Sequence, residues 1–119
     1  MNQDTLFLGP LEQKIMELVW ESKGITCREL VDQLNTNSKK KIAYTTLMTV
    51  TDRLYKKGFL ARQKKGKTYI YSYKETRNET LRSFAESVLK SLANRFGEDA
   101  IVAFSKEIKE LSDKDKKDE

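Results

Sequence analysis

Four polar side chains on one predicted helix are the residues in this sequence best suited to contact another molecule. The helix lies within the stretch 42–60, where Leu47, Val50 and Leu54 recur at spacings of three and four and form one apolar face. Threonine hydroxyls and an arginine guanidinium on the other faces can hydrogen bond to base edges or to phosphates. These polar residues are Thr45, Thr46, Thr49 and Arg53.

Two sets of lysines flank this helix in the sequence. The first set immediately precedes the helix and consists of Lys39, Lys40 and Lys41. These lysines either belong to a solvated loop or contact phosphates, because the start of a helix also offers free amide donors to an anion. The second set surrounds Gly66 at the tip of a predicted hairpin, as expected for a wing that contacts a nucleic-acid backbone. It consists of Lys64, Lys65 and Lys67.

The composition argues against an enzyme. The 119 residues include no histidine and a single cysteine, Cys27, which excludes Ser-His-Asp triads and most zinc sites. The sequence also has no glycine-rich phosphate loop and no isolated acidic pair in an apolar setting. We therefore expect no enzymatic activity, no metal site and no cofactor. We interpret Cys27 as a small packing residue, although a thiol in the first turn of a helix can be activated.

Positive charge is concentrated in the first part of the chain. Residues 1–74 contain 14 Lys and Arg against 7 Asp and Glu, whereas residues 75–119 contain 9 against 11. Between Lys39 and Lys74 there are 11 basic residues and one acidic residue, Asp52. This asymmetry indicates a polyanion-binding module joined to a part with another task. No apolar run is long enough to span a membrane and no signal peptide is apparent, so we expect a cytoplasmic protein without a membrane partner.

The elements that position these residues follow from local signals. A helix begins at Pro10 and is expected to end at Gly24, and Thr26 with Glu29 forms a capping box for a second helix. The third helix ends at Gly58, and strands follow over residues 59–64 and 68–73. The predicted fold is mainly α with a small β-hairpin. Its first 74 residues form a winged helix-turn-helix DNA-binding domain, with a recognition helix at about 43–58 and a basic wing at 64–67.

Three tyrosines on the second strand leave an alternative open. Strand alternation places Tyr69, Tyr71 and Tyr73 on one face, where they could stack on the bases of a single strand. They could equally cover the helices as packing residues, which is the interpretation we favour. Winged helices also serve as protein-interaction modules, so a protein-interaction module and a low-specificity RNA or single-strand binder are the alternatives to a DNA reader.

The second part of the chain is predicted to form two amphipathic helices. Thr76 and Glu79 form a second capping box, Gly97 ends the first helix, and a further apolar stripe runs over residues 100–111. Their apolar faces either pack back on the first domain or form a symmetric dimer, which is the arrangement we prefer. We thus expect a helical dimerisation region over residues 75–111 and a disordered charged tail over residues 112–119. The predicted interface residues are Leu81, Phe84, Val88, Leu92, Phe96, Ile101, Phe104 and Ile108.

Three segments resemble the penicillinase repressor family of winged-helix repressors, the BlaI, MecI and CopY type. They are LGPLEQKIMELVW at residues 8–20, AYTTLMTVTDRLYKKGFL at 43–60 and TYIYSY at 68–73. The resemblance implies a homodimeric transcriptional repressor whose partner is a palindromic double-stranded DNA operator. It places Tyr44 on the recognition helix beside the threonines and Arg53, and it implies that the helices after residue 76 form the dimer interface.

Two departures from the family pattern concern regulation. Members that act in β-lactam resistance are inactivated by proteolysis at an Asn-Phe bond, and the matching positions here are Ala103 and Phe104. The copper-responsive members carry a Cys-x-Cys motif near the C-terminus, whereas this chain has no cysteine after Cys27. The resemblance therefore excludes copper sensing by that route and leaves an unidentified effector or a protease as the further partner.

Overall fold

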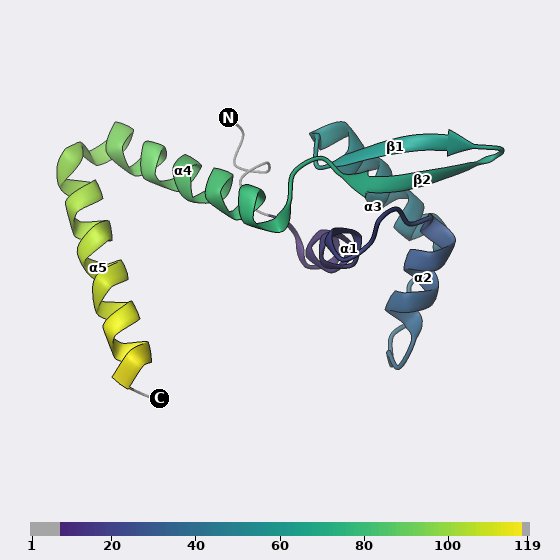
Figure 1. Cartoon of the computed structure of the whole chain (residues 1–119), viewed down its shortest axis with the longest axis horizontal. Coiled ribbons are helices and arrows are strands. Elements are labelled where there is room, and N and C mark those ends of the chain that lie inside the picture. The colour runs from purple at the N-terminus through teal and green to yellow at the C-terminus, as the bar shows by residue number, and fades with distance from the viewer. Residues whose placement is uncertain (1–7, 118–119) are drawn as a thin grey trace. The chain divides into compact units, whose positions relative to one another are not determined.

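The computed structural model describes the backbone of residues 8–117 and the side chains of residues 8–114. The first seven residues of the predicted DNA-binding domain and the last two of the predicted tail lie outside the described residues. Along the described part, five helices and one two-stranded antiparallel sheet follow one another (Figure 1). They are α1 (Pro10–Trp20), α2 (Cys27–Asn35), α3 (Tyr44–Lys57), β1 (Leu60–Lys65), β2 (Thr68–Tyr73), α4 (Arg77–Phe96) and α5 (Glu98–Lys117).

Local signals set most of the element boundaries. The capping box at the start of α2 is confirmed, since the Thr26 amide donates to Glu29 Oε1 at 3.1 Å and the Glu29 amide donates to Thr26 Oγ1 at 3.2 Å. Thr76 and Glu79 form the same pair of bonds at the start of α4, at 2.9 and 3.1 Å. Helix α3 ends at Gly58, whose φ of 94° lies in the left-handed region that glycine adopts without strain. These three predictions were correct.

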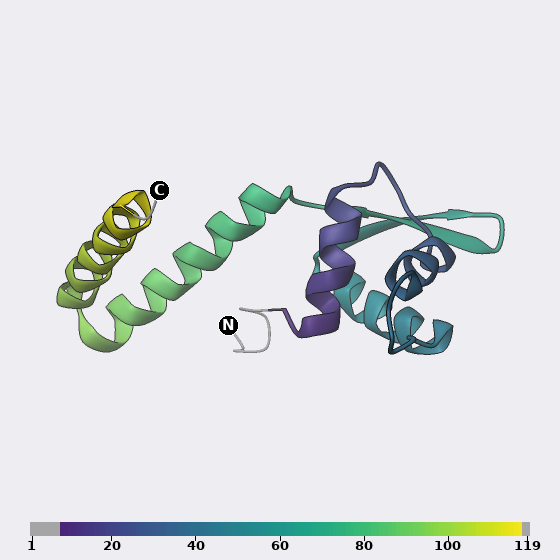
Figure 2. The same ribbon diagram turned by 90° about the horizontal axis from the view of Figure 1, so that it is seen from below.

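Helices α1, α2 and α3 lie together beside the hairpin (Figure 2). Buried side chains from these elements form one apolar core. Its fully buried side chains include Ile15, Val19, Leu30 and Leu60. Cys27 is also buried in this core, as its interpretation as a packing residue requires. Burial raises the pKa of the Cys27 thiol, which favours its protonated form.

The buried face of α3 differs in one residue from the predicted apolar stripe. Leu47 and Leu54 are fully buried, but the third fully buried residue is Thr51, while Val50 lies at the edge and is only half-buried. Thr51 can be buried because its hydroxyl donates to the Leu47 carbonyl at 2.7 Å within the same helix. The helix is therefore rotated slightly about its axis relative to the prediction.

Gly24 has a different role from the one predicted. Helix α1 ends at Trp20, not at Gly24, and the chain then extends so that Ile25 pairs with Tyr71 of β2 through backbone bonds of 2.9 and 2.8 Å. A Cβ atom on Gly24 would lie 2.9 Å from Cγ2 of Ile70, and its φ of 148° also favours glycine. Glycine is required here for the close approach of this segment to the hairpin.

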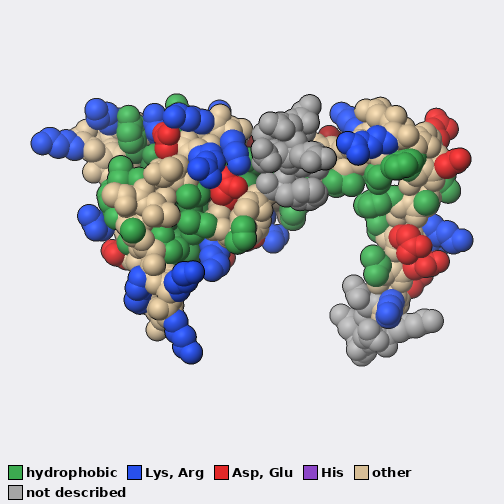
Figure 3. Space-filling view, turned by 180° about the vertical axis from the view of Figure 1, so that it is seen from behind, with side chains coloured by type: hydrophobic (Ala, Val, Ile, Leu, Met, Phe, Trp, Pro, Cys, Tyr) green, Lys and Arg blue, Asp and Glu red, His purple; other side chains and the backbone are tan. Residues whose placement is uncertain are grey.

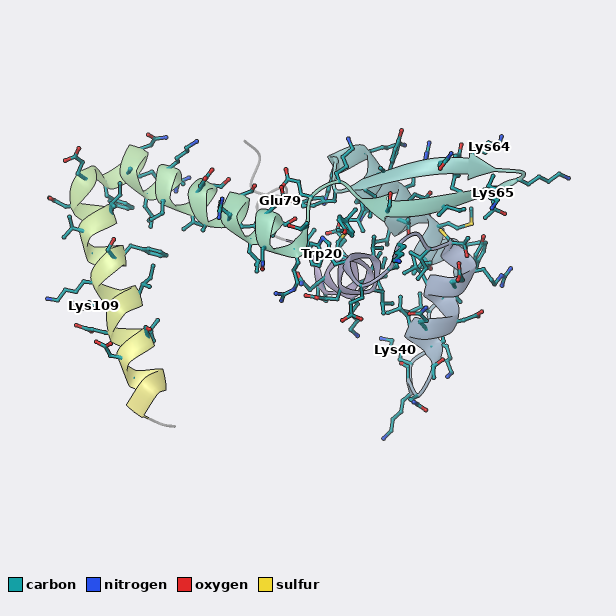
Figure 4. The ribbon with its side chains drawn as sticks, in the orientation of Figure 1. Trp20, Lys40, Lys64, Lys65, Glu79 and Lys109 are labelled. Carbon is teal, nitrogen blue, oxygen red and sulfur yellow. The ribbon has the colours of Figure 1, made fainter. Side chains whose placement is uncertain are left out.

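The chain divides into two compact units, the first extending to Leu81 and the second beginning at Arg82. The first unit extends beyond the domain boundary predicted after Lys74, because the start of α4 is bonded to α1. The Trp20 indole donates to the Glu75 carbonyl at 3.1 Å, and Arg77 Nε lies 3.1 Å from Glu17 Oε2. Figure 4 shows Trp20 next to the beginning of α4.

In the second unit, α5 continues to Lys117, so residues 112–117 are helical and the prediction of a disordered tail there was wrong. No glycine or proline follows Gly97 to end the helix. Among residues 82–114 no side chain is buried. Helices α4 and α5 thus form no closed core among the side chains that the structure describes.

Candidate nucleic-acid interface

The outward face of α3 is polar and accessible. The four side chains predicted to contact bases all lie exposed on this helix, and they are Thr45, Thr46, Thr49 and Arg53. Thr45 and Thr49 are separated by one helical turn, and the Thr49 hydroxyl donates to the Thr45 carbonyl at 3.0 Å. Met48, a residue that is 46% exposed, adds an apolar contact surface to the same helix. Hydroxyls, a guanidinium and a thioether side by side suit the mixed polar and apolar edges of base pairs.

Tyr44 differs from these four residues because it is held by a neighbouring helix. Its ring is half-buried and packs against the core, and the Arg28 guanidinium of α2 lies 4.5 Å from the ring centroid. This cation–π contact restrains both side chains at the start of α3. Arg28 was not predicted as a site residue, since nothing in the local pattern of α2 indicates which residue of α3 it faces.

The three lysines before α3 lie on a loop that side-chain bonds hold in place. Asn35 bonds to both backbone groups of Ile42, at 2.7 and 3.0 Å, and Lys41 Nζ donates to the Asn35 carbonyl at 2.6 Å. Lys39 and Lys40 are exposed, and Figure 4 shows Lys40 on this loop. Lys41 is also exposed, although its ammonium already donates a hydrogen bond to a backbone carbonyl at the end of α2.

The hairpin carries its lysines at the tip. Lys64, Lys65 and Lys67 are exposed around Gly66, whose φ of 66° makes the tight turn, and Figure 4 shows Lys64 and Lys65 in this region. In the space-filling view, Lys and Arg side chains gather at this tip and on the loop before α3 (Figure 3). Exposed ammonium groups on short protruding loops are well placed to contact phosphates.

The tyrosine face of β2 does not form a stacking platform. The middle residue, Tyr71, is 5% exposed and belongs to the core, whereas Tyr69 and Tyr73 are each 37% exposed. Single-strand binding by consecutive stacked bases requires exposed aromatic faces. The packing role that the sequence favoured therefore holds for Tyr71.

Sequence reasoning missed a charged cluster between α3 and the hairpin. Asp52 pairs through Oδ2 with Lys56 Nζ at 3.0 Å and through Oδ1 with Arg62 NH1 at 3.1 Å. The Arg62 guanidinium lies between two rings, 3.9 Å from the centroid of Tyr55 and 4.3 Å from that of Tyr69. Hydrogen bonding from Lys56, and then from Arg62, holds the pKa of Asp52 below its usual range. The i, i+4 spacing of Asp52 and Lys56 was a visible signal, but the Arg62 contacts depend on the tertiary fold.

The residues predicted to form a dimer interface lie along α4 and α5 with partly or widely exposed side chains. Leu81, Phe96, Ile101 and Ile108 are 47%, 71%, 37% and 51% exposed, and Phe84, Val88, Leu92 and Phe104 are half-buried. Figure 3 shows hydrophobic side chains on the visible surface of this second unit. Exposed apolar side chains that gather on one surface are typical of interaction sites.

Comparisons with known proteins agree with this geometry. The sequence profile of the penicillinase repressor family matches residues 8–118. The chain is 28% identical over 110 residues to the penicillinase repressor of Staphylococcus aureus, covering 86% of this chain and 85% of that protein. It is also 28% identical over 92 residues to an uncharacterized 16.5 kDa protein of Latilactobacillus sakei; this match covers 77% of the present chain but only 62% of the relative.

A solved structure supports the fold. The solution structure of the DNA-binding domain of the repressor BlaI superimposes with a TM-score of 0.54 at 23% sequence identity, covering 66% of this chain and 93% of that domain.

Among the described residues, no helix is long and apolar enough to cross a membrane.

Proposed function

This chain belongs to the penicillinase repressor family of winged-helix transcriptional repressors, and we propose that it acts as a homodimer on a palindromic DNA operator. Helix α3 enters the major groove, and the hairpin tip and the loop before α3 contact phosphates on either side. The outward face of α3 carries this proposal, since its exposed threonines and Arg53 combine donors, acceptors and methyl groups that distinguish base pairs.

The start of α3 supports a phosphate contact there. No side chain caps this helix, whose N-cap residue is Ala43, whereas α2 and α4 both begin with complete capping boxes. The first amides of a helix have no partner within the helix, and a phosphate oxygen is a suitable acceptor for them. Lys39 and Lys40 of the preceding loop add positive charge at the same end.

The second unit supports the homodimer. Helices α4 and α5 expose an apolar stripe and bury no side chain among residues 82–114, so they lack a core of their own. A twofold interface lets identical stripes cover each other. It also presents two copies of α3 to two half-sites, and each copy raises the effective concentration of the other at the operator.

Selection of bound sequences from a random duplex pool tests the proposal. With the full chain at near-physiological salt, we expect a palindrome whose half-sites lie about one helical turn, roughly 34–36 Å, apart. A parallel selection with the Arg53→Ala variant should yield the same palindrome, but one position in each half-site should lose its base preference. Recovery of unrelated sequences by the wild-type chain would overturn the operator proposal and favour a protein-interaction module.

Regulation by an unidentified effector or by a protease stays a prediction. The positions that match the family's scissile bond, Ala103 and Phe104, lie in the interior of α5, and Phe104 is half-buried. A protease would need to unwind this part of the helix before it could cleave there.

A further inference from the structure

Asp52 is an acidic residue on a surface that we propose to face phosphates. It lies one residue before Arg53 and three after Thr49, and it is the one Asp or Glu in the sequence between Lys39 and Lys74. Its side chain is 40% exposed. A carboxylate at this position repels the DNA backbone, so its presence calls for a compensating role.

The two oxygens of Asp52 engage two different cations. Oδ2 pairs with Lys56, whose side chain is 74% exposed on the same helix, at 3.0 Å. Oδ1 accepts from Arg62 of β1, whose side chain is only 24% exposed and lies between the rings of Tyr55 and Tyr69. The first contact is made within α3, whereas the second joins α3 to the hairpin.

We propose that Asp52 is a specificity-determining residue with two tasks, a proposal that rests on DNA binding by α3 and the hairpin. Through Oδ2 it withholds the charge of Lys56 from DNA phosphates. Through Oδ1 it holds Arg62 and thereby fixes the hairpin against α3 in the orientation that an operator requires.

The two tasks act on different complexes. Attraction between cations and phosphates supplies nearly all of the affinity for random DNA, so neutralising Lys56 suppresses that affinity. A fixed hairpin favours the operator complex, because only this complex demands one geometry of α3 and wing, and pre-organisation removes part of the ordering cost. Asp52 thus raises the ratio of operator affinity to random-DNA affinity, which decides occupancy in a genome.

The experiment compares Asp52→Ala and Asp52→Asn in the full chain on operator and random duplexes over a range of salt concentrations. Both variants should steepen the slope of log K against log salt on random DNA by about 0.9, the value for one additional phosphate contact. Between 1 M and 0.15 M salt, this additional slope corresponds to about a fivefold gain in the affinity of the variants for random DNA relative to the wild type. This gain on random DNA should lower the operator-to-random ratio in both variants. Asn keeps an oxygen that can accept from Arg62, so Asp52→Ala should lower the ratio further than Asp52→Asn.

A double variant, Asp52→Ala with Lys56→Gln, identifies the released cation and should return the slope to the wild-type value. A slope that is unchanged in Asp52→Ala, or still steep in the double variant, would overturn the role assigned to Lys56. The same operator-to-random ratio in Asp52→Ala and Asp52→Asn would overturn the positioning role of Oδ1. A tenfold loss on the operator alone would show instead that Asp52 reads a base.

Failure of the proposal and failure of the proposed function give different results. If the wild-type chain shows no preference for any duplex sequence, the operator proposal fails, whereas the slope on random DNA still tests Lys56. The fluorescence of Trp20, the single tryptophan of the chain, verifies that each variant keeps the first unit folded.

Discussion

The ion pair between Glu12 and Lys57 joins the first turn of α1 to the last turn of α3, and its removal gives a quantitative test of the fold. Lys57 Nζ lies 3.0 Å from Glu12 Oε2, with side-chain exposures of 21% and 11%. Glu12 Oε1 also accepts from the Gly9 amide at 2.9 Å. Replacing Lys57 by Met keeps an unbranched side chain that is one atom shorter, but it leaves a largely buried carboxylate without its cation.

The expected loss in the free energy of unfolding of Lys57→Met lies between two limits. Exposed pairs contribute about 0.2–1 kcal/mol, and breaking a fully buried pair costs about 3–5 kcal/mol. The pair here is mostly buried, but the Gly9 amide continues to bond the carboxylate in the variant. We therefore expect Lys57→Met to lower the free energy of unfolding by about 2 kcal/mol at pH 7.

The loss should depend on pH in a defined direction. Burial acts to raise the pKa of Glu12, but the Gly9 amide and Lys57 outweigh it and hold this pKa below the ordinary value of 4.5. A carboxyl group whose pKa is lowered by folding stabilises the protein above its unfolded pKa, and this stabilisation is lost as the pH falls through the folded pKa. The difference between wild type and Lys57→Met should accordingly shrink below about pH 4.5.

Urea unfolding followed by Trp20 fluorescence measures this difference, because Trp20 lies in the same unit as the ion pair. Lys56→Met is the matched control: it removes the adjacent lysine from the same helix end, but its 74% exposed side chain should contribute about 0.5 kcal/mol or less. Equal losses in the two variants, or a loss in Lys57→Met that is the same at pH 7 and pH 3.5, would refute this reasoning.

Three further predictions concern binding and assembly. Arg53→Ala should weaken operator binding by about 1–3 kcal/mol while changing random-DNA affinity much less, as competition titrations would measure; equal losses on both DNAs would exclude base readout. Lys65→Ala should lower affinity for every duplex and reduce the salt slope by about one, and an unchanged slope would remove Lys65 from the phosphate contacts. Ile108→Asp should convert the proposed dimer to a monomer in light scattering, whereas Lys106→Asp on the opposite face of α5 should not; a dimeric Ile108→Asp would show that the proposed interface is misplaced.

Features encoded within a few residues were predictable from the sequence. The capping boxes at Thr26 and Thr76 and the helix end at Gly58 depend on neighbouring residues, so the pattern alone indicated them. The exposed face of α3 was predictable for the same reason, because the 3.6-residue period fixes which side chains oppose Leu47 and Leu54.

Features that depend on tertiary contacts were not predictable in this way. The Thr51 side chain is polar, and it can be buried because its hydroxyl donates to a backbone carbonyl within α3. The sequence pattern predicted that Gly24 ends a helix. Its proximity to Ile70 depends on the position of the hairpin, which the local sequence does not specify. The contacts of Arg62 with Tyr55, Tyr69 and Asp52 bring together two elements whose mutual orientation no local pattern specifies.

The uncapped start of α3 has a consequence for the dynamics of the free protein. Without a capping side chain at Ala43, the first amides of α3 lack the acceptor that the capping boxes supply at the starts of α2 and α4. Their protons should exchange with solvent early in the free chain. In the proposed complex, a phosphate that accepts from these amides would supply the missing cap and stabilise the first turn of the helix.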